Sequence, residues 1–325
     1  MMTEYTWFEG IAFSTIGMKK ENLEDIRNKF VVKEEDLILL TYPKSGTNWL
    51  VEIVCLIQTR GDPKWIQSVP TWERSPWLES NIGYSVLINK EGPRLMTSHL
   101  PFQLFSRSLF SSKAKVIYAI RNPRDVLVSA YFFWGKTNLV KNPGSLETYF
   151  EWFLKGNEAH AYRNPLWIPT FVWKISPNTY LCPCNLAIGY LLLVSVVIIY
   201  GSWFEHVCDW LSMREHDNFL VLYYEDMKKD TMGTIKKICD FLGKKLGPDE
   251  LDLVIKYSSF EVMKENNMSN FSLIKKDVIT NGLNLMRKGT TGDWKNHFTV
   301  AQAEAFDKVF QEKMAGFPPG IFPWE

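Results

Sequence analysis

The chain has 325 residues, of which 46% are hydrophobic and 22% charged, a composition typical of a globular protein with one large α/β domain or two smaller ones. Its 37 lysine and arginine residues nearly balance 36 aspartate and glutamate residues, which leaves a formal net charge of +1. No global field therefore favours nucleic acid or a membrane as a partner, and any anion site must be local. The opening MMTEYTWFEGIAF lacks the basic and apolar regions of a secretory signal, so we expect a reducing, cytoplasmic location.

Short aliphatic runs alternate with helical stretches along the chain, which predicts an α/β domain with a central parallel sheet flanked by helices. Strands are predicted over residues 37–42, 94–98, 115–120 and 219–224. Helices are predicted over residues 47–58, 124–134, 146–154, 233–242 and 300–314. Each predicted strand is followed at once by polar or unusual residues. Because ligands bind beyond the carboxyl ends of parallel strands, we expect these residues to meet in one crevice.

The first of these strand ends carries the stretch TYPKSGTNWL, residues 41–50. A nucleotide-hydrolase loop would read G-x-x-x-x-G-K-[ST], whereas here a single Gly46 follows Lys44. A strand, a turn with one glycine and a helix still direct free N–H groups and the positive helix end at an anion. We therefore predict a phosphate-binding loop similar to that of nucleotide kinases. The alternative is an ordinary strand, turn and helix with a surface lysine.

Further cations and a hydroxyl follow the other predicted strands. Lys44 suits a phosphate or a bridging oxygen that gains charge, and Arg121 offers a planar fork to a terminal phosphate. Ser129 lies eight residues after Arg121, within the predicted helix, where it can face the same crevice. The stretch Arg287-Lys288-Gly289 adds two cations beside a flexible glycine. Together they predict a ligand with two separated phosphate-like groups.

His99 follows a predicted strand and lies among apolar neighbours, in the stretch TSHLP. Because its ring titrates near neutral pH, we predict a general base, the alternative being a hydrogen-bonded histidine of the core. The other histidines show no ligand spacing with one another or with the cysteines, so we expect no metal site. These histidines are His160, His206, His216 and His297. The cysteines are odd in number and scattered along the chain, so we expect all of them to be free thiols. They are Cys55, Cys182, Cys184, Cys208 and Cys239.

Several long motifs resemble a known family. TYPKSGTNW, RNPRDVLVSAYFFW and RKGTTGDWKNHFT resemble the signatures of cytosolic sulfotransferases, which use 3′-phosphoadenosine 5′-phosphosulfate (PAPS) as donor. WFEGIAF, WIQSVPTWERSPWLES and the ending FPWE resemble the hydroxysteroid (alcohol and bile salt) branch. The resemblance covers residues 7–156 and 200–325 and implies one sulfotransferase domain over residues 1–325, interrupted at about 157–196.

The resemblance also implies a role for each matching residue. It implies that the donor's 5′-phosphosulfate and adenine side bind Lys44, Ser45, Gly46, Thr47, Asn48 and Trp49. It implies that the 3′-phosphate binds Arg121, Ser129, Arg287, Lys288 and Gly289, and that Tyr224, Ser258 and Met263 line the nucleotide pocket. His99 would remove the acceptor's hydroxyl proton, and Lys44 would stabilise the bridging oxygen as the S–O bond breaks, with no metal required.

Five aromatic residues suit a flat apolar acceptor pocket, which the branch resemblance assigns to steroids, bile acids or similar alcohols. They are Trp72, Trp77, Phe133, Trp134 and Tyr200, and for any single ring the alternative is ordinary core. The segment KNHFTVAQAE matches the family's homodimer contact at Lys295, Thr299, Val300 and Glu304. A helix capped at Thr299 is a second, compatible interpretation.

Residues 157–196 depart from the family pattern and include much of the apolar run LAIGYLLLVSVVIIY, residues 186–200. A membrane span needs about 20 apolar residues, so a span over residues 186–204 is one alternative. Pro183, Asn185 and the lack of a flanking Lys/Arg cluster argue against it. We interpret the insert as translated non-coding or alternatively spliced sequence. The alternative function is then an impaired variant that keeps the donor pocket and acts only by binding or dimerisation.

Overall fold

A parallel sheet forms the centre of the molecule. The computed structural model describes residues 5–142, 144–156, 197–274, 278 and 285–325. Among these residues the sheet has the strand order β4-β3-β5-β6, with every neighbouring pair parallel. The strands are β3 (Leu37–Thr41), β4 (Leu95–Ser98), β5 (Lys115–Ile120) and β6 (Phe219–Tyr223). The predicted strands are thus confirmed to within one residue at each end.

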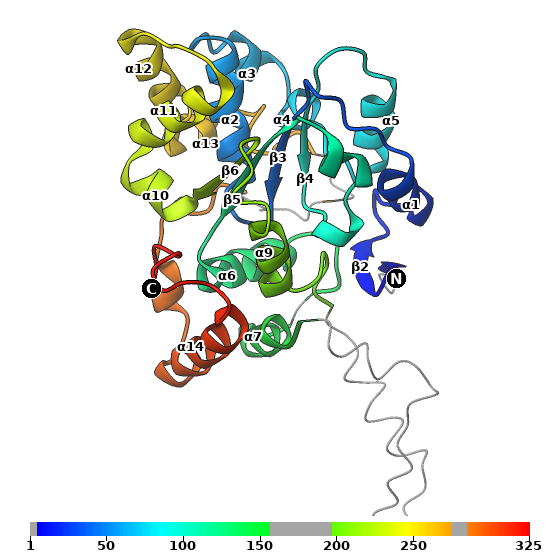
Figure 1. Ribbon diagram of the computed structural model, residues 1–325. Helices are drawn as coiled ribbons and strands as arrows, with labels where there is room; N and C mark the ends of the chain where they lie inside the picture. The colour runs from blue at the N-terminus through cyan, green and yellow to red at the C-terminus, as the bar shows by residue number, and fades with distance from the viewer. Residues whose placement is uncertain (1–4, 143, 157–196, 275–277, 279–284) are drawn as a thin grey trace, which may run out of the picture.

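Helices cover both faces of the sheet (Figure 1). Along β3, Leu37 and Leu39 enter one hydrophobic core, while Ile38 and Leu40 enter the other, as the alternation of a strand requires. The first core is built with α2 (Thr47–Gln58), α3 (Lys64–Ser68), α10 (Tyr224–Lys229), α11 (Thr231–Leu242) and α12 (Pro248–Tyr257). The second is built with α1 (Lys20–Asn28), α5 (Asn81–Asn89), α6 (Pro123–Trp134), α7 (Leu146–Lys155), α9 (Trp203–Leu211) and α14 (Val300–Met314).

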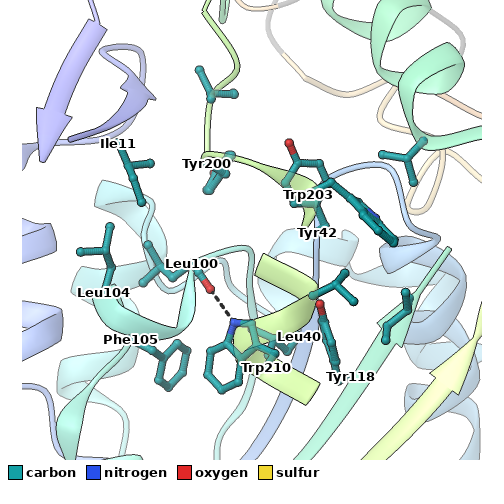
Figure 2. Close-up of a cluster of buried hydrophobic side chains, with 14 of the residues drawn as sticks. Ile11, Leu40, Tyr42, Leu100, Leu104, Phe105, Tyr118, Tyr200, Trp203 and Trp210 are labelled. Carbon is teal, nitrogen blue, oxygen red and sulfur yellow. Dashed lines mark hydrogen bonds between the residues drawn. The ribbon is translucent and has the colours of Figure 1, made fainter. Parts of the chain in front are cut away.

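The second core is rich in aromatic rings, part of which Figure 2 shows. Trp210 is fully buried there, and its indole Nε1 donates a hydrogen bond to the carbonyl oxygen of Leu100 at 3.1 Å. Its ring stacks on Phe219 of β6. Because Leu100 directly follows His99, this core fixes the backbone on which the predicted base sits.

The predicted helices are confirmed, with small changes at their ends. Helices α2 and α14 have the predicted bounds, and α11 begins two residues early. Helix α14 is N-capped as expected, because the Thr299 side chain accepts a hydrogen bond from the backbone N–H of Gln302. The shorter elements are α4 (Thr71–Arg74), α13 (Phe260–Glu265), η1 (Phe102–Leu104), η2 (Arg107–Ser111) and η5 (Asp293–Asn296).

An N-terminal hairpin was not among the predicted elements. Strand β1 (Tyr5–Phe8) pairs antiparallel with β2 (Ile11–Ser14). Ala12 of β2 forms a parallel bridge with Ile199, and its carbonyl accepts the backbone N–H of Tyr200 at 3.0 Å. The hairpin therefore holds the segment that follows residue 196.

The chain segments on either side of residues 157–196 lie against each other. Gly156 ends α7 with φ 60°, and a Cβ atom added to it would lie 3.1 Å from the Cβ atom of Ser202. The predicted insert itself, residues 157–196, lies outside the described residues, as do Cys182 and Cys184. Among the described cysteines, Cys55, Cys208 and Cys239 are free thiols.

The alternative of a membrane span falls largely on the same segment. Residues 186–196 lie outside the described part of the chain, and the end of the candidate span belongs to α9. None of the helices within the described ranges has the length and apolar character needed to cross a membrane.

Because the two flanks already meet, we predict that deletion of residues 157–196 leaves a cooperatively folding protein and raises its soluble yield. The measurements are soluble yield and thermal unfolding followed by circular dichroism. As a control, deletion of Leu146–Lys155 removes the buried rings of Tyr149, Phe150 and Phe153 and should abolish folding. An unfolded product from the first deletion would contradict the prediction.

Candidate active site

A cavity of about 440 Å³ opens at the carboxyl ends of the strands. Its wall includes Lys44 after β3, His99 after β4, Arg121 after β5 and Tyr224 after β6. The four strand ends selected in the sequence thus meet in one place, as expected for an open parallel sheet.

The loop between β3 and α2 depends on the absence of a side chain at Gly46. Gly46 has φ 96°, and an added Cβ atom would lie only 2.6 Å from Cδ2 of Tyr224. Lys44 also has positive φ, at 69°. At the end of the loop, the Thr47 and Thr41 hydroxyl groups are 2.7 Å apart. This backbone directs the N-terminus of α2 and its free N–H groups toward the cavity.

Lys44 is a partly buried cation without a carboxylate beside it in the described residues. Its Nζ lies 3.7 Å from the ring centroid of Phe133. Burial, followed by the charges of Arg121 and Arg287, lowers the pKa of Lys44 to about 7. An anion between these cations would stabilise the charged lysine, so the site is electrostatically suited to one.

Arg121 is held in place while its charge stays available. The guanidinium donates to the carbonyl oxygens of Lys44 and Thr290, each at 3.1 Å, and lies 4.4 Å from the ring centroid of Tyr224. The side chain is buried, and its Nε has no hydrogen-bond partner in the described part of the chain. A buried guanidinium that the described residues hold through carbonyl groups and a ring face favours a phosphate-like ligand.

The segment with Arg287 and Lys288 reaches the same cavity, where both cations pair with Asp293. Arg287 Nη2 lies 2.7 Å and Lys288 Nζ 2.6 Å from its carboxylate oxygens. Burial disfavours the Asp293 charge, but hydrogen bonds from Lys288, Asn296 and Arg287 hold the pKa of this carboxyl well below its usual range. Asp293 therefore holds the side chains of Arg287 and Lys288 next to each other at the wall of the cavity.

This segment is fastened to the rest of the site from two sides. Asp125 of α6 accepts hydrogen bonds from the backbone N–H groups of Gly292 at 2.7 Å and Trp294 at 3.0 Å. Gly289 has φ 65°, and a Cβ atom there would lie 2.2 Å from Cδ2 of Phe260. Glycine is needed at this position because both its conformation and its close contact exclude a side chain.

The His99 ring is held at both nitrogens. Nδ1 lies 2.8 Å from the Thr41 carbonyl oxygen, to which it can only donate. Nε2 therefore carries a lone pair, which accepts the indole N–H of Trp77 at 3.0 Å. Burial, with a smaller contribution from the Lys44 charge, lowers the pKa of His99 to about 4, against the hydrogen bond to Thr41 that raises it. At neutral pH the ring is an unprotonated base.

Aromatic rings surround this base. The rings of Tyr200 and His99 meet edge to face with centroids 5.4 Å apart, and Trp77 packs against Phe271 at 6.2 Å. Trp72 contacts the same Phe271 ring at 5.5 Å. The base therefore faces an apolar part of the cavity, and the cations face the other part.

Most of the predicted site residues line this cavity. They are Lys44, Gly46, Thr47, Asn48, Trp49, Trp77, His99, Arg121, Ser129, Phe133, Trp134, Tyr200, Tyr224, Ser258, Met263, Arg287, Lys288 and Gly289. Of the residues predicted for the donor and the acceptor, two are not part of its wall. Ser45 is fully buried, with no hydrogen-bond partner for its hydroxyl among the described residues, and Trp72 contacts Phe271, which does line the cavity.

Other residues of the wall were not predicted. They include Ser14, Met18, Lys228, Thr231, Phe260, Phe271, Met286 and Thr290. Ser14 and Met18 come from the N-terminal hairpin and the turn after it, whose place beside the strand ends depends on the nonlocal bridge to Ile199. Phe271 adjoins the aromatic pair Trp72 and Trp77 only in three dimensions, so no local signal identifies it.

The model of the sulfotransferase domain family matches residues 34–318 of the chain. The chain belongs to the sulfotransferase family. Sulfotransferase 2A1 of Mus musculus is 72% identical over 325 residues, with 100% of both chains covered. A 3-beta-hydroxysteroid sulfotransferase of Cavia porcellus is 55% identical over 319 residues, covering 98% of this sulfotransferase and 97% of the relative.

Solved structures show the same fold. Mouse sulfotransferase SULT7A1 complexed with PAP matches with a TM-score of 0.70 and 26% identity, covering 96% of each chain. Retinol dehydratase in complex with androsterone and inactive cofactor PAP matches with a TM-score of 0.74 and 20% identity, covering 98% of this chain and 93% of that one. The central parallel sheet flanked by helices is therefore the sulfotransferase fold.

We predict that Gly46→Ala weakens PAP binding by more than tenfold, because the new methyl group would strike the Tyr224 ring that supports Arg121. Positive φ alone costs a non-glycine residue about 1–2 kcal/mol. Gly10→Ala is the matched control, since Gly10 has φ 78° with nothing within 4 Å of an added Cβ. Calorimetry should show normal PAP affinity for the control; equal losses in both variants would argue against the contact with Tyr224.

We further predict that Trp77→Phe raises the pKa of His99 by up to about one unit. The indole N–H stabilises the unprotonated Nε2, and one neutral hydrogen bond contributes about 0.5–1.5 kcal/mol, or up to about one pKa unit. An NMR titration of the His99 ring measures the shift. Trp72→Phe, whose ring contacts Phe271 instead, should leave the midpoint unchanged. A fall in the midpoint with Trp77→Phe would contradict the assignment of the lone pair.

Proposed function

We propose that this sulfotransferase transfers a sulfuryl group from PAPS to the hydroxyl group of a steroid, bile acid or similar alcohol. The observation that carries the proposal is one cavity with two chemistries. Lys44, Arg121 and Arg287 supply positive charge at one part of it, and the unprotonated His99 lies among aromatic rings at the other. A donor with several negative charges fits the first part, and an apolar alcohol fits the second.

The proposed mechanism assigns one role to each group. His99 Nε2 accepts the proton of the acceptor hydroxyl as its oxygen attacks sulfur, in line with the departing phosphate oxygen. Because Nδ1 donates to the Thr41 carbonyl, the ring is held in the tautomer that can accept this proton. Lys44 stabilises the charge that develops on the departing oxygen. Trp77 must give up its hydrogen bond to Nε2 when the acceptor binds.

The donor assignment draws on the structural relatives and on the cations. PAP, the nucleotide in the titles of two matching structures, is what PAPS becomes when it loses its sulfuryl group. Its two phosphate groups correspond to the two groups of cations, one around Lys44 and one at Arg287 and Lys288. We propose that the N-terminus of α2 binds the 5′-phosphosulfate and that Arg121, Ser129 and the segment of residues 287–289 bind the 3′-phosphate.

The acceptor assignment draws on the curated relatives and on the apolar wall. One relative is named a 3-beta-hydroxysteroid sulfotransferase. In this chain Trp77, Phe133, Trp134 and Tyr200 line the cavity near His99. Flat rings around one base suit a rigid, flat alcohol.

An impaired variant that only binds or dimerises is the less favoured function. The family match spans residues 34–318, and His99 and Lys44 line the same cavity. The lowered pKa of His99 keeps its ring unprotonated, as a base requires, and the lowered pKa of Lys44 reflects the cations around it, which an anion would offset. We therefore propose an active enzyme. We place it in the cytoplasm, which agrees with the free thiols of its three described cysteines.

The first test compares His99→Ala with Lys44→Ala. Loss of the base should lower kcat for steroid sulfation by about a hundredfold or more while PAP affinity stays unchanged. Loss of Lys44 should weaken PAP binding and also lower kcat by a similar factor. The exposed His216→Ala serves as a control with normal kinetics. Normal turnover of the His99 variant with labelled donor would rule out the general base.

We also propose that the enzyme forms a homodimer through the start of α14. Lys295, Thr299, Val300 and Glu304 are all exposed, and the Val300 side chain is 76% exposed. Val300 and Glu304 are four residues apart and therefore share one face of the helix. An apolar residue between polar ones suits a small self-complementary contact.

Val300→Glu should therefore produce monomers, because a two-fold contact would bring two new carboxylates together. Light scattering measures the mass. Val86→Glu, an exposed valine of α5, is the matched control and should leave the mass unchanged. An unchanged mass for the Val300 variant would mean that this helix start does not form the contact.

A further inference from the structure

Glu79 is a fully buried carboxylate beside the proposed base, and it does not line the cavity. It belongs to a segment that runs along the outer edge of β4. The backbone N–H of Leu78 donates to the Thr97 carbonyl at 2.9 Å, and the Thr97 N–H donates to the Pro76 carbonyl at 3.0 Å. This pairing places Glu79 level with the end of β4.

The carboxylate accepts hydrogen bonds from groups around His99. Oε1 accepts the backbone N–H of His99 at 2.9 Å, and Oε2 accepts the Ser98 hydroxyl at 3.0 Å. The Tyr200 hydroxyl also interacts with this carboxylate, and it lies 3.6 Å from Met18 Sδ. The His99 N–H and the Ser98 hydroxyl are donors, which is why an acceptor-only group suits the position.

These contacts join two of the supports of His99. The Tyr200 ring packs edge to face on the His99 ring, and Tyr200 itself holds a backbone φ of 66°. The hydroxyl end of Tyr200 and the backbone of His99 both meet Glu79. Glu79 therefore closes a loop of contacts from the His99 backbone, through the carboxylate and Tyr200, to the His99 ring.

Removing a carboxylate from water costs free energy, and the raised pKa of Glu79 reflects this cost. Burial raises the pKa of Glu79 to about 7, against the hydrogen bonds of His99, Ser98 and Tyr200 that lower it. An apolar side chain would fill the same space with a smaller desolvation free energy. The carboxylate is therefore best explained by the groups that it binds.

We propose that Glu79 is a positioning residue for sulfuryl transfer, which fixes the His99 backbone and the Tyr200 ring against each other so that Nε2 faces the acceptor. The inference rests on the proposed role of His99 as base. Glu79 does not touch the reacting atoms, and its effect passes through His99 and Tyr200. A small displacement of a catalytic group is enough to lower a rate by about a hundredfold.

The test is a double-mutant cycle of Glu79→Gln and Tyr200→Phe, in the full chain. Glu79→Gln keeps the shape but replaces one acceptor oxygen by a donor, so kcat for steroid sulfation should fall by about tenfold to a hundredfold, with the acceptor KM and PAP affinity within about twofold. Tyr200→Phe removes only the hydroxyl and should also lower kcat. Because both changes break the same loop of contacts, the double variant should be no more than about twofold slower than the slower single variant.

A matched control separates positioning from general stability. Asp36 is another buried carboxylate, paired with Arg94 at the amino end of β3, away from the cavity. Asp36→Asn should lower the unfolding temperature yet leave kcat per folded molecule unchanged. If Glu79→Gln behaves like Asp36→Asn, or if the losses in the cycle multiply, the proposal is overturned.

A second measurement does not depend on activity. NMR of the His99 ring in the wild type should show the Nδ1–H tautomer and a titration midpoint near 4, the pKa that burial produces. Glu79→Gln should loosen the ring and move the midpoint toward the ordinary value. An unchanged tautomer and midpoint would overturn the proposal. If the wild type sulfated no alcohol, the proposed function would fail, while this titration would still decide whether Glu79 positions His99.

Discussion

The parallel register of β3 with its two neighbours is the constraint on which the site depends. Leu40 lies opposite Ser98, and Thr41 lies opposite Ala119. The next residue after Ser98 is His99, which therefore reaches the Thr41 carbonyl with its ring. A slip of one residue would turn every side chain of the strand to the other face of the sheet and break this contact. The hydrogen bonds between these strands therefore fix both the packing of the two cores and the position of the His99 ring.

The cations of the cavity are held in two different ways. Lys44 and Arg121 rest on the ring faces of Phe133 and Tyr224, and Arg121 also donates to carbonyl oxygens. Ring faces and carbonyl groups orient a cation while leaving its charge uncompensated. Arg287 and Lys288 instead share Asp293, so their net charge is smaller before a ligand arrives. An anion therefore gains more electrostatic stabilisation from Lys44 and Arg121 than from Arg287 and Lys288.

Local signals predicted much of this molecule. The bounds of α2 follow from Gly46 and the apolar pattern after it, and those of α14 follow from its cap at Thr299. The strand ends identified Lys44, His99 and Arg121 because each lies within three residues of the end of a buried strand. The resemblance to sulfotransferases then suggested a role for each of them, and the family itself is confirmed.

What the sequence could not predict is nonlocal. Asp125 holds the backbone of Gly292 from 167 residues away, and Trp77 reaches His99 across 22 residues. Glu79 has no local pattern that separates it from a surface glutamate, because its burial depends on how its segment lies along β4. Such contacts arise only when the sheet has formed, and side-chain spacing along the chain carries no trace of them.

The contact between Gly156 and Ser202 has a consequence for how this fold varies. The free energy of closing a loop rises slowly with its length, by about 0.6 kcal/mol for each doubling. Where two flanks already touch, a change in the length of chain between them therefore costs little free energy. The strands of the sheet keep their register, and the cavity at their ends keeps its shape. The junction is a place where evolution, or a protein engineer grafting a reporter domain, can lengthen the polypeptide without redesigning the core.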